Sequence, residues 1–520
     1  MVFSQQQLRL VQFTFAIVLS SSLGVSMAFA GGDQCESIFV STKSKRQIGV
    51  SEDFVAKMQS RRRSAADKML QKFTTEKGLA APMNTSPKHD NNYSFELPEG
   101  TIKDQQRSGR CWIFASLTAI ENFYLGKGNL MPDAEFSRTY LQFFNMLERS
   151  SSHLEKVIDL RRNSQRISSS TILQRIAPKI ADGGYVEDII FLIKKYGLVT
   201  TSAMPETLNS LNTDLLLAEL NSYLQVKSYE MWNLSENFDS EARALHDRIV
   251  RGQAENTTKY DKVSLQALSE AQLQILEAKK EEILGGVWLI LEKALGTPPK
   301  TFTAKVPVTN PKTGVAQTKI RKFEPQKFVT DYMKFNPEDW INVSNLRNRP
   351  RDQVYQVKYQ DMNRVIRRLN LDPVRMMNLV KAQLKAGMPV PFDSNFGPGV
   401  NRKTGDMEPG TDDLKGMFPY KQGQAPRRLS KSELDILGIL TADHETVFMG
   451  YDQPEGYANP IKFKVENSWS DQYGNGGNFN LSAQWFDLYV DGIMIHKSML
   501  SPEELAIFNG KPIILKATNE

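Results

Sequence analysis

The chain has 520 residues, of which 40% are hydrophobic and 24% are charged, and its formal net charge is +6. These proportions are typical of a globular protein, and the length corresponds to roughly two to four domains. The charge is small for this length, so composition gives no reason to expect nucleic acid as a partner.

Residues 1–30 have the pattern of an export signal. Arg9 supplies the positive charge, an apolar stretch runs from Leu10 to about Val25, and Ala28-Phe29-Ala30 gives a small-x-small cleavage pattern. The alternative is an N-terminal membrane anchor, but the stretch is diluted by serines and is short against the about 20 apolar residues of a span. We therefore expect cleavage after Ala30, a secreted or periplasmic protein, and no stable membrane span after cleavage.

A polar and charged extension follows, over residues 31–94. It contains Cys35, one of only two cysteines in the chain. A disulfide between Cys35 and Cys111 is formally available in an oxidising compartment. Cys35 lies in a polar tail with no evident reason to approach Cys111, so we do not expect this pairing.

Helical patterns dominate the middle of the chain. They predict helices over residues 111–125, 138–147 and 187–196, and the tract 205–296 is helical in pattern almost throughout. Gly285-Gly286 is a candidate interruption, and Gly296 with Pro298-Pro299 ends the tract. Its heptads are too irregular for a coiled coil, so we expect a packed helical subdomain.

From about Val354 the character changes to short apolar or alternating segments between turns. These segments predict antiparallel strands over residues 388–392, 445–451, 462–466 and 477–481. With helices concentrated early and strands late, the fold class is α+β.

Cys111 is the first candidate catalytic residue, because it stands at the predicted start of a helix. Unpaired N–H groups and the helix dipole favour a thiolate there, and the thiolate is the nucleophilic form. Gly109 would let a substrate backbone come close, and the Gln105 amide could donate to an oxyanion. The alternative is a buried, inert thiol, which is the common fate of a free cysteine.

A cysteine nucleophile needs a histidine as its general base. His444 is the best placed of the five histidines, because it enters an apolar strand-like run; the others are His89, His153, His246 and His496. Asn467 follows another predicted strand and is followed closely by Trp469. An Asn oxygen can hold one imidazole nitrogen so that the other faces the thiol, and the indole could shield that bond from water.

These motifs together resemble the papain-type cysteine peptidases. Gln105…Cys111-Trp112, Asp443-His444 and Asn467-Ser468-Trp469 occur in the family's order. The separation of Cys111 and His444 is much larger than the about 130–150 residues usual in papain-type enzymes. A large helical insertion in this core resembles the bleomycin hydrolase and aminopeptidase C family, and the resemblance extends over roughly residues 95–515.

The resemblance implies a papain-like fold: a helical half, an antiparallel β-barrel-like half and a large helical insertion. It divides the chain into residues 95–204 with the nucleophile, 205–345 as the insertion, and 346–520 with the histidine, asparagine and tail, after the signal and the polar extension.

The resemblance also implies the roles of the site residues. Cys111, His444 and Asn467 would be catalytic, and Gln105 with the Cys111 N–H would form the oxyanion hole. Gly183 and Gly184 would hold an extended peptide; Trp112, Asp443 and Trp469 would support the site. The peptide substrates would be cleaved without metal or cofactor, and the family suggests a homohexamer.

Three features depart from the family pattern: the signal peptide, the substitutions Glu445 and Ser470 beside the motifs, and the tail. Family members end in an arm that binds the substrate amino group, whereas only residues 516–520 follow Leu515 here. The sequence predicts an exported cysteine peptidase acting as an aminopeptidase. The alternatives are an endopeptidase with an open cleft, or a catalytically silent exported protein that binds peptides.

Overall fold

The computed structural model describes residues 50–77, 87–126, 135–163, 171, 174–234, 259–309, 316–359, 364–409 and 429–515. The predicted signal peptide, Cys35, His246 and residues 516–520 lie outside these ranges. The chain forms two compact units, Met1–Gly78 and Leu79–Glu520. The first contains helices α2 (Glu52–Gln59) and α3 (Ala65–Lys77). The second contains every other element and all the candidate site residues.

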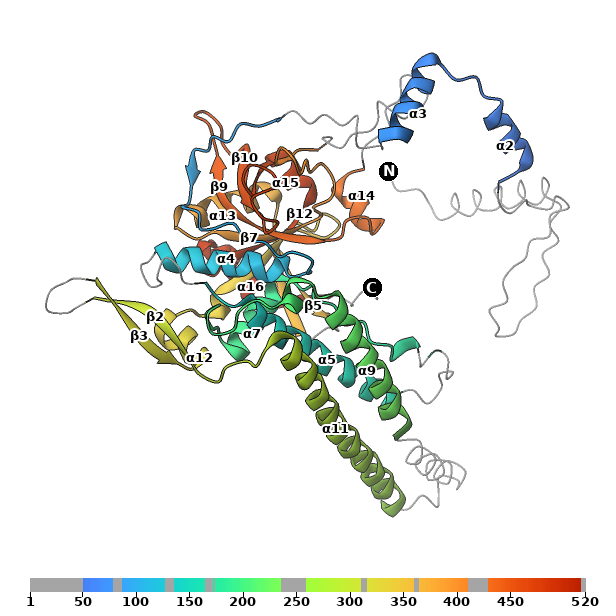
Figure 1. Cartoon of the computed structure of the whole chain (residues 1–520), viewed down its shortest axis with the longest axis vertical. Coiled ribbons are helices and arrows are strands. Elements are labelled where there is room, and N and C mark those ends of the chain that lie inside the picture. Colours follow the sequence, from blue (N-terminus) through green and yellow to red (C-terminus); the bar gives the residue numbers. More distant parts are fainter. Residues whose placement is uncertain are drawn as a thin grey trace, which may run out of the picture. The chain divides into compact units, whose positions relative to one another are not determined.

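The helices predicted before the long tract are present (Figure 1). They are α4 (Cys111–Gly126), α5 (Arg138–Asn163) and α7 (Val186–Tyr196). Helix α5 runs well beyond the predicted end near Leu147. The serines at 150–152 weaken the apolar pattern there, but Leu154, Val157 and Ile158 resume it and are buried.

The tract 205–296 forms α8 (Leu208–Leu211), α9 (Asp214–Leu234) and α11 (Lys259–Leu295). Helix α11 continues through Gly285-Gly286, so the candidate interruption does not occur. A Cβ at Gly286 would overlap the Tyr223 hydroxyl of α9, so this glycine lets the two helices approach closely. The tract is a packed helical region, as predicted.

Eleven strands of the described chain form one mixed sheet. The order along it is β13-β5-β6-β4-β12-β7-β9-β10-β11-β8, with β1 paired to β9. The four predicted strands are β7 (Val390–Ser394), β9 (His444–Asp452), β10 (Lys462–Glu466) and β11 (Asn478–Ser482), and they pair antiparallel in succession. The remaining strands are β1 (Phe95–Glu96), β4 (Trp340–Ser344), β5 (Gln353–Tyr359), β6 (Arg364–Asn370), β8 (Asp406–Met407), β12 (Val490–His496) and β13 (Ile513–Leu515).

Several elements were not predicted from the sequence. Strands β2 (Phe302–Thr309) and β3 (Ala316–Phe323) form a separate antiparallel hairpin. Three pairs in the large sheet are parallel: β4 with β6, β5 with β13, and β8 with β11. The sheet is covered by α13 (Pro373–Lys385) and α15 (Ala483–Tyr489), while α14 (Lys431–Ile436) and α16 (Pro502–Asn509) are short. The shortest helical turns are α12 (Pro325–Lys327), η1 (Phe328–Met333), η2 (Pro337–Asp339) and η4 (Lys497–Met499).

Two large apolar cores flank helix α4. One lies among α4, α5, α7, α9, α11 and the hairpin, and the other among the sheet, α13 and α15. Helix α4 contacts both the helices and the sheet (Figure 1). Its small residues Ala115 and Ala119 pack on Val447 and Met449 of β9, which brings the helix close to the strand. This contact sets the start of α4 beside the start of β9. The division of this unit at residues 204 and 345 stays a prediction.

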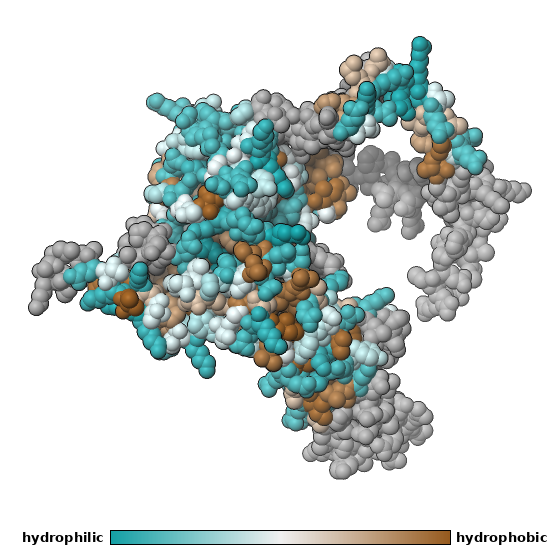
Figure 2. Space-filling model, in the orientation of Figure 1, coloured by the Kyte–Doolittle hydropathy of each residue, from teal (hydrophilic) through white to brown (hydrophobic). Residues whose placement is uncertain are grey.

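The visible surface is mostly hydrophilic, with apolar side chains gathered along the outer helices (Figure 2). Leu215, Val226 and Tyr229 of α9 and Leu289 of α11 are among the exposed ones. No helix in the described part of the chain is long and apolar enough to cross a membrane.

Candidate active site

Cys111 is the first residue of α4. The carbonyl of Arg110 accepts from the N–H groups of Ile113 and Phe114 at 2.9 and 3.0 Å, so the helix begins at Cys111. The Trp112 N–H lies within hydrogen-bonding range of the sulfur. Cys111 is a free thiol and is partly exposed, so a substrate can reach it.

His444 and Asn467 are brought together by two adjacent strands. His444 is the first residue of β9, and Asn467 directly follows β10, whose last residue Glu466 pairs with Val447 of β9. His444 Nε2 lies 2.8 Å from Asn467 Oδ1, which also accepts from the Ser468 N–H at 2.7 Å. The second ring nitrogen, Nδ1, remains for another partner.

The thiol lies next to the histidine strand. The N–H of Glu445, the residue after His444, is within hydrogen-bonding range of the Cys111 sulfur. Contacts between α4 and β9 therefore bring the thiol beside the start of the strand that carries His444, although 332 residues lie between Cys111 and His444 in the chain.

Aromatic side chains enclose the imidazole. The Trp469 ring lies against His444 with its centroid 4.7 Å away and a tilt of 31°, and Phe396 meets the ring edge-on at 4.7 Å. The Arg402 guanidinium lies 4.6 Å from the Trp469 centroid. The sequence singled out Trp469 but gave no signal for Phe396 or Arg402, because their partners lie far along the chain.

The Gln105 side chain is buried and held at both ends. Its Nε2 donates to the Ser108 carbonyl at 2.7 Å, and its Oε1 accepts from Ser468 Oγ at 2.7 Å. An amide nitrogen carries two N–H bonds, so one donor remains after the bond to Ser108. Ser468, which the sequence singled out only as part of a motif, fixes the orientation of this amide.

The glycine turn is held by Trp112 and Asp182. Trp112 Nε1 donates to the Asp182 carbonyl at 3.1 Å, and a Cβ at Gly184 would lie 2.6 Å from the Trp112 ring. A Cβ at Gly183 would meet nothing within 4 Å. Gly184 is therefore needed for packing, whereas Gly183 faces open space.

Gly109 has a different role from the expected one. A Cβ there would lie 2.5 Å from the Asp182 carboxylate, which accepts from the Gly109 N–H at 2.6 Å and from Thr213 Oγ1 at 2.5 Å. The glycine thus accommodates Asp182 and ties the loop before Cys111 to the glycine turn.

Asp443 supports the backbone before His444. Its Oδ1 accepts from the Phe396 N–H at 2.7 Å, and its own N–H donates to the Ser394 carbonyl at 3.0 Å. These bonds join the start of β9 to the end of β7.

Three other histidines fall in the described ranges. They hydrogen-bond elsewhere, with His89 at Glu408, His153 at Ser228 and His496 at Ser498. Within those same ranges, no cluster of three or more His, Cys, Asp or Glu residues could hold a metal ion.

Burial opposes the thiolate that was expected at the helix start. Burial raises the pKa of Cys111 to about 12, and the Glu445 carboxylate adds to this rise. The Trp112 N–H lowers the pKa, as predicted for a helix start, and so does the Glu445 N–H of β9, but burial outweighs both. Burial lowers the pKa of His444 to about 4, although the Asn467 bond opposes this. Burial thus opposes ionisation of both the thiol and the imidazole.

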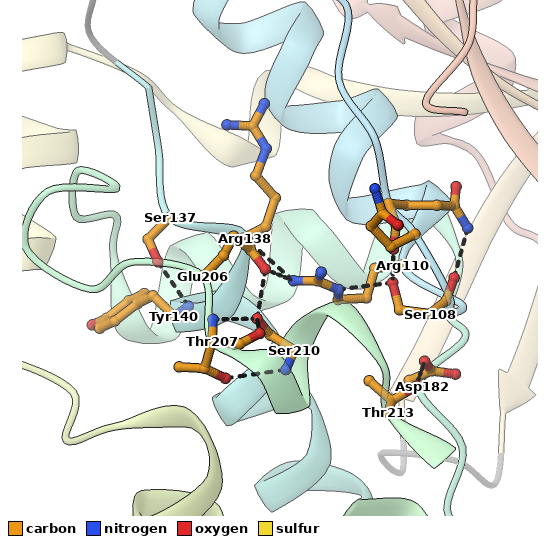
Figure 3. A network of polar contacts seen from close by, with 12 residues as sticks. Ser108, Arg110, Ser137, Arg138, Tyr140, Asp182, Glu206, Thr207, Ser210 and Thr213 are labelled. Atoms are coloured by element: carbon orange, nitrogen blue, oxygen red, sulfur yellow. Dashed lines mark hydrogen bonds and ion pairs between the residues drawn. The ribbon is translucent and has the colours of Figure 1, made fainter. Parts of the chain in front are cut away.

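Arg110 is the residue directly before the thiol, and its side chain is anchored by a polar network (Figure 3). It was assigned no role from the sequence. Its side chain is fully buried; Nη1 lies 2.8 Å from Glu206 Oε2, and Nε donates to Ser108 Oγ at 3.0 Å. Glu206 also accepts from Ser210 Oγ at 2.6 Å. The network joins the loop of Gln105 to the segment before α8. The role of Arg110 depends on its burial, and the local sequence carries no signal for burial.

The fold is that of the papain-like cysteine peptidases. The crystal structure of PepW from Lactobacillus rhamnosis HN001 matches with a TM-score of 0.70 and 27% identity, covering 90% of this chain and 97% of that one. The α+β, papain-like fold class is thereby confirmed.

The family follows from the sequence match. The model of the Peptidase C1-like family matches residues 49–255 and 251–519, so the chain belongs to this family and is a cysteine-type peptidase. Aminopeptidase C of Lactococcus lactis subsp. lactis (strain IL1403) is 28% identical over 454 residues, covering 85% of this chain and 91% of the relative. Aminopeptidase W of Lactobacillus delbrueckii subsp. lactis is 26% identical over 437 residues, covering 83% and 88%.

Proposed function

We propose that this protein is an exported aminopeptidase that hydrolyses peptides through Cys111, His444 and Asn467. The observation that carries the catalytic assignment is the 2.8 Å bond between His444 Nε2 and Asn467 Oδ1. It uses one ring nitrogen and leaves Nδ1 for the thiol that lies beside the same strand. This is the arrangement of a nucleophile, a base and an orienting group.

The reaction would proceed by acyl transfer. Cys111 Sγ attacks the peptide carbonyl carbon while His444 Nδ1 takes the thiol proton, so that neither group needs to be charged beforehand. The oxyanion accepts from the free N–H of Gln105 and from the Cys111 N–H. His444 then protonates the leaving amine as the C–N bond breaks, and water activated by His444 hydrolyses the thioester.

The exopeptidase assignment rests on the relatives, which are named aminopeptidases C and W. Gly183, where an added Cβ would meet nothing within 4 Å, would hold the substrate backbone. The tail residues that bear on this assignment, 516–520, lie outside the described ranges. Export after Ala30 rests on the signal pattern, and a homohexamer rests on the resemblance; light scattering of the mature protein tests the latter.

The decisive test compares free and N-acetylated peptide amides with wild type and Cys111→Ala. An aminopeptidase cleaves only the free peptides, and Cys111→Ala is inactive but folded. Cleavage of acetylated peptides would favour an endopeptidase. Equal hydrolysis by wild type and Cys111→Ala would contradict the catalytic assignment. No hydrolysis of any peptide by wild type would favour a peptide-binding protein. N-terminal sequencing of the exported protein should begin at Gly31.

A further inference from the structure

Glu445, one of the two substitutions beside the motifs, has an unusual position. Side chains alternate along β9, and Val447 and Met449 on the same face pack against Ala115 and Ala119 of α4. Glu445 therefore faces the first turn of α4, where Cys111 lies. The side chain is buried, with the residue only 4% exposed.

The carboxyl group of Glu445 also reaches the glycine turn. It accepts from the N–H of Val186, the first residue of α7, which follows Gly183-Gly184-Tyr185. One oxygen, Oε2, has no hydrogen-bond partner among the described residues. A buried carboxyl oxygen without a donor is costly in a native protein and needs a functional or structural reason.

A second acid lies across the strand pair. Asp393 of β7 is directly opposite Glu445 in the register, is 2% exposed, and likewise has an oxygen, Oδ1, with no partner in the described chain. Burial and Asp393 raise the pKa of Glu445 well above its usual value. Arg368, the cation that acts on both acids, also lies 3.0 Å from Glu187 and 3.7 Å from Asp491, and Lys431 lies 3.9 Å from Asp491. This part of the site therefore holds more acids than cations.

We infer that Glu445, backed by Asp393, is a specificity-determining residue that binds a cationic nitrogen of the substrate beside the bond cleaved at Cys111. An ammonium supplies the donor that Oε2 lacks, and its charge stabilises the ionised form of the carboxyl, which burial and Asp393 disfavour. The inference rests on the proposed function, because it takes the space between Cys111 and Gly183 as the peptide site. The nitrogen can be the free α-amine of the peptide or the side chain of a lysine or arginine.

Binding is measured with Cys111→Ala protein, so that the result does not depend on hydrolysis. The probes are Leu-Ala-Ala, acetyl-Leu-Ala-Ala, acetyl-Lys-Leu-Ala-Ala and acetyl-Ala-Leu-Ala-Ala, each titrated by calorimetry. Glu445→Gln in this background is expected to weaken a cationic peptide by about 10- to 100-fold, the range of one charge-assisted hydrogen bond. The same substitution should change the affinity for the neutral peptide of each pair by no more than about twofold.

Loss confined to Leu-Ala-Ala identifies the α-amine as the ligand, and loss confined to the lysine peptide identifies the side chain. The matched control is Glu466→Gln, another buried acid at 4% exposure, on β10, which should weaken none of the peptides selectively. Equal changes for cationic and neutral peptides, or no change, would overturn the inference. Failure of wild type to hydrolyse any peptide is a separate result, which would overturn the proposed function but not the binding preference.

Discussion

Asn467→Ala tests the orienting bond of the site most directly. During attack His444 becomes an imidazolium, and Asn467 Oδ1, 2.8 Å from Nε2, then accepts from a charged donor. Hydrogen bonds to charged groups contribute about 1.5–3 kcal/mol, which corresponds to about a 10- to 150-fold loss in kcat. The loss should stay in this range because Trp469 and Phe396 still enclose the ring.

The assay is steady-state hydrolysis of a free-amine peptide amide between pH 2.5 and 9, so that the series extends below the pKa of His444, which is about 4. We expect kcat to fall with little change in KM. The acid limb of the kcat/KM profile should move to lower pH, because the Asn467 bond raises the pKa of His444 against the effect of burial. A merely structural asparagine would not shift this limb.

The matched control is Asn342→Ala. Asn342 is 3% exposed and accepts from Ser344 Oγ at 3.0 Å, in a strand that does not pair with β9. It should lower stability and leave kcat unchanged. If Asn467→Ala lost less than about threefold in kcat, or behaved like Asn342→Ala, the orienting role would be wrong.

Three stability predictions follow from other contacts. Glu206→Gln should lower the free energy of unfolding by about 1–3 kcal/mol in urea titrations, because it leaves buried Arg110 without its anion. The loss is limited because Glu206 itself is partly exposed, and an unchanged free energy of unfolding would contradict the prediction. Ser470→Gly should raise the free energy of unfolding by about 0.5–1 kcal/mol, because the left-handed φ of 67° at Ser470 strains any residue other than glycine. A free energy of unfolding below that of wild type would refute this strain. Burial raises the pKa of Glu466 to about 8, above its usual 4.5. The stability that this residue contributes to wild type therefore falls as the pH rises from 4.5 through 8, by at most about 1.4 kcal/mol per pH unit. The free energy of unfolding of Glu466→Gln should therefore increase relative to that of wild type over this pH range. A difference between the two that does not depend on pH would contradict the prediction.

Local patterns were enough to predict the elements that carry the candidate site. The helix at Cys111 and the strands at His444 and before Asn467 each have clear periodicity and lie where expected. The backbone at Ser470 is left-handed, the conformation that favours glycine, which accounts for the glycine usual at this position of the motif but not for the serine here. The common order of these motifs therefore predicted the papain-like fold class.

Contacts between distant segments were not predictable from the sequence. Phe396 encloses His444, and Glu206 pairs with Arg110, but neither partner carries a periodic or motif signal. The hairpin of β2 and β3 was also not predicted, although apolar residues alternate with polar ones along β2, which is the pattern of a half-buried strand. Burial decides these interactions, and burial is a property of the assembled fold.

The protonation of Cys111 shows how strongly the assembled fold can reverse a local expectation. The helix start supplies an N–H group that favours the thiolate, but packing of α4 on β9 shields the partly exposed thiol from much of the solvent and places Glu445 beside it, so the pKa rises to about 12. A cation bound at Glu445 would remove part of this opposing charge. Substrates with an ammonium group would then bind and also ease removal of the thiol proton, so one carboxyl could couple recognition to activation of the nucleophile.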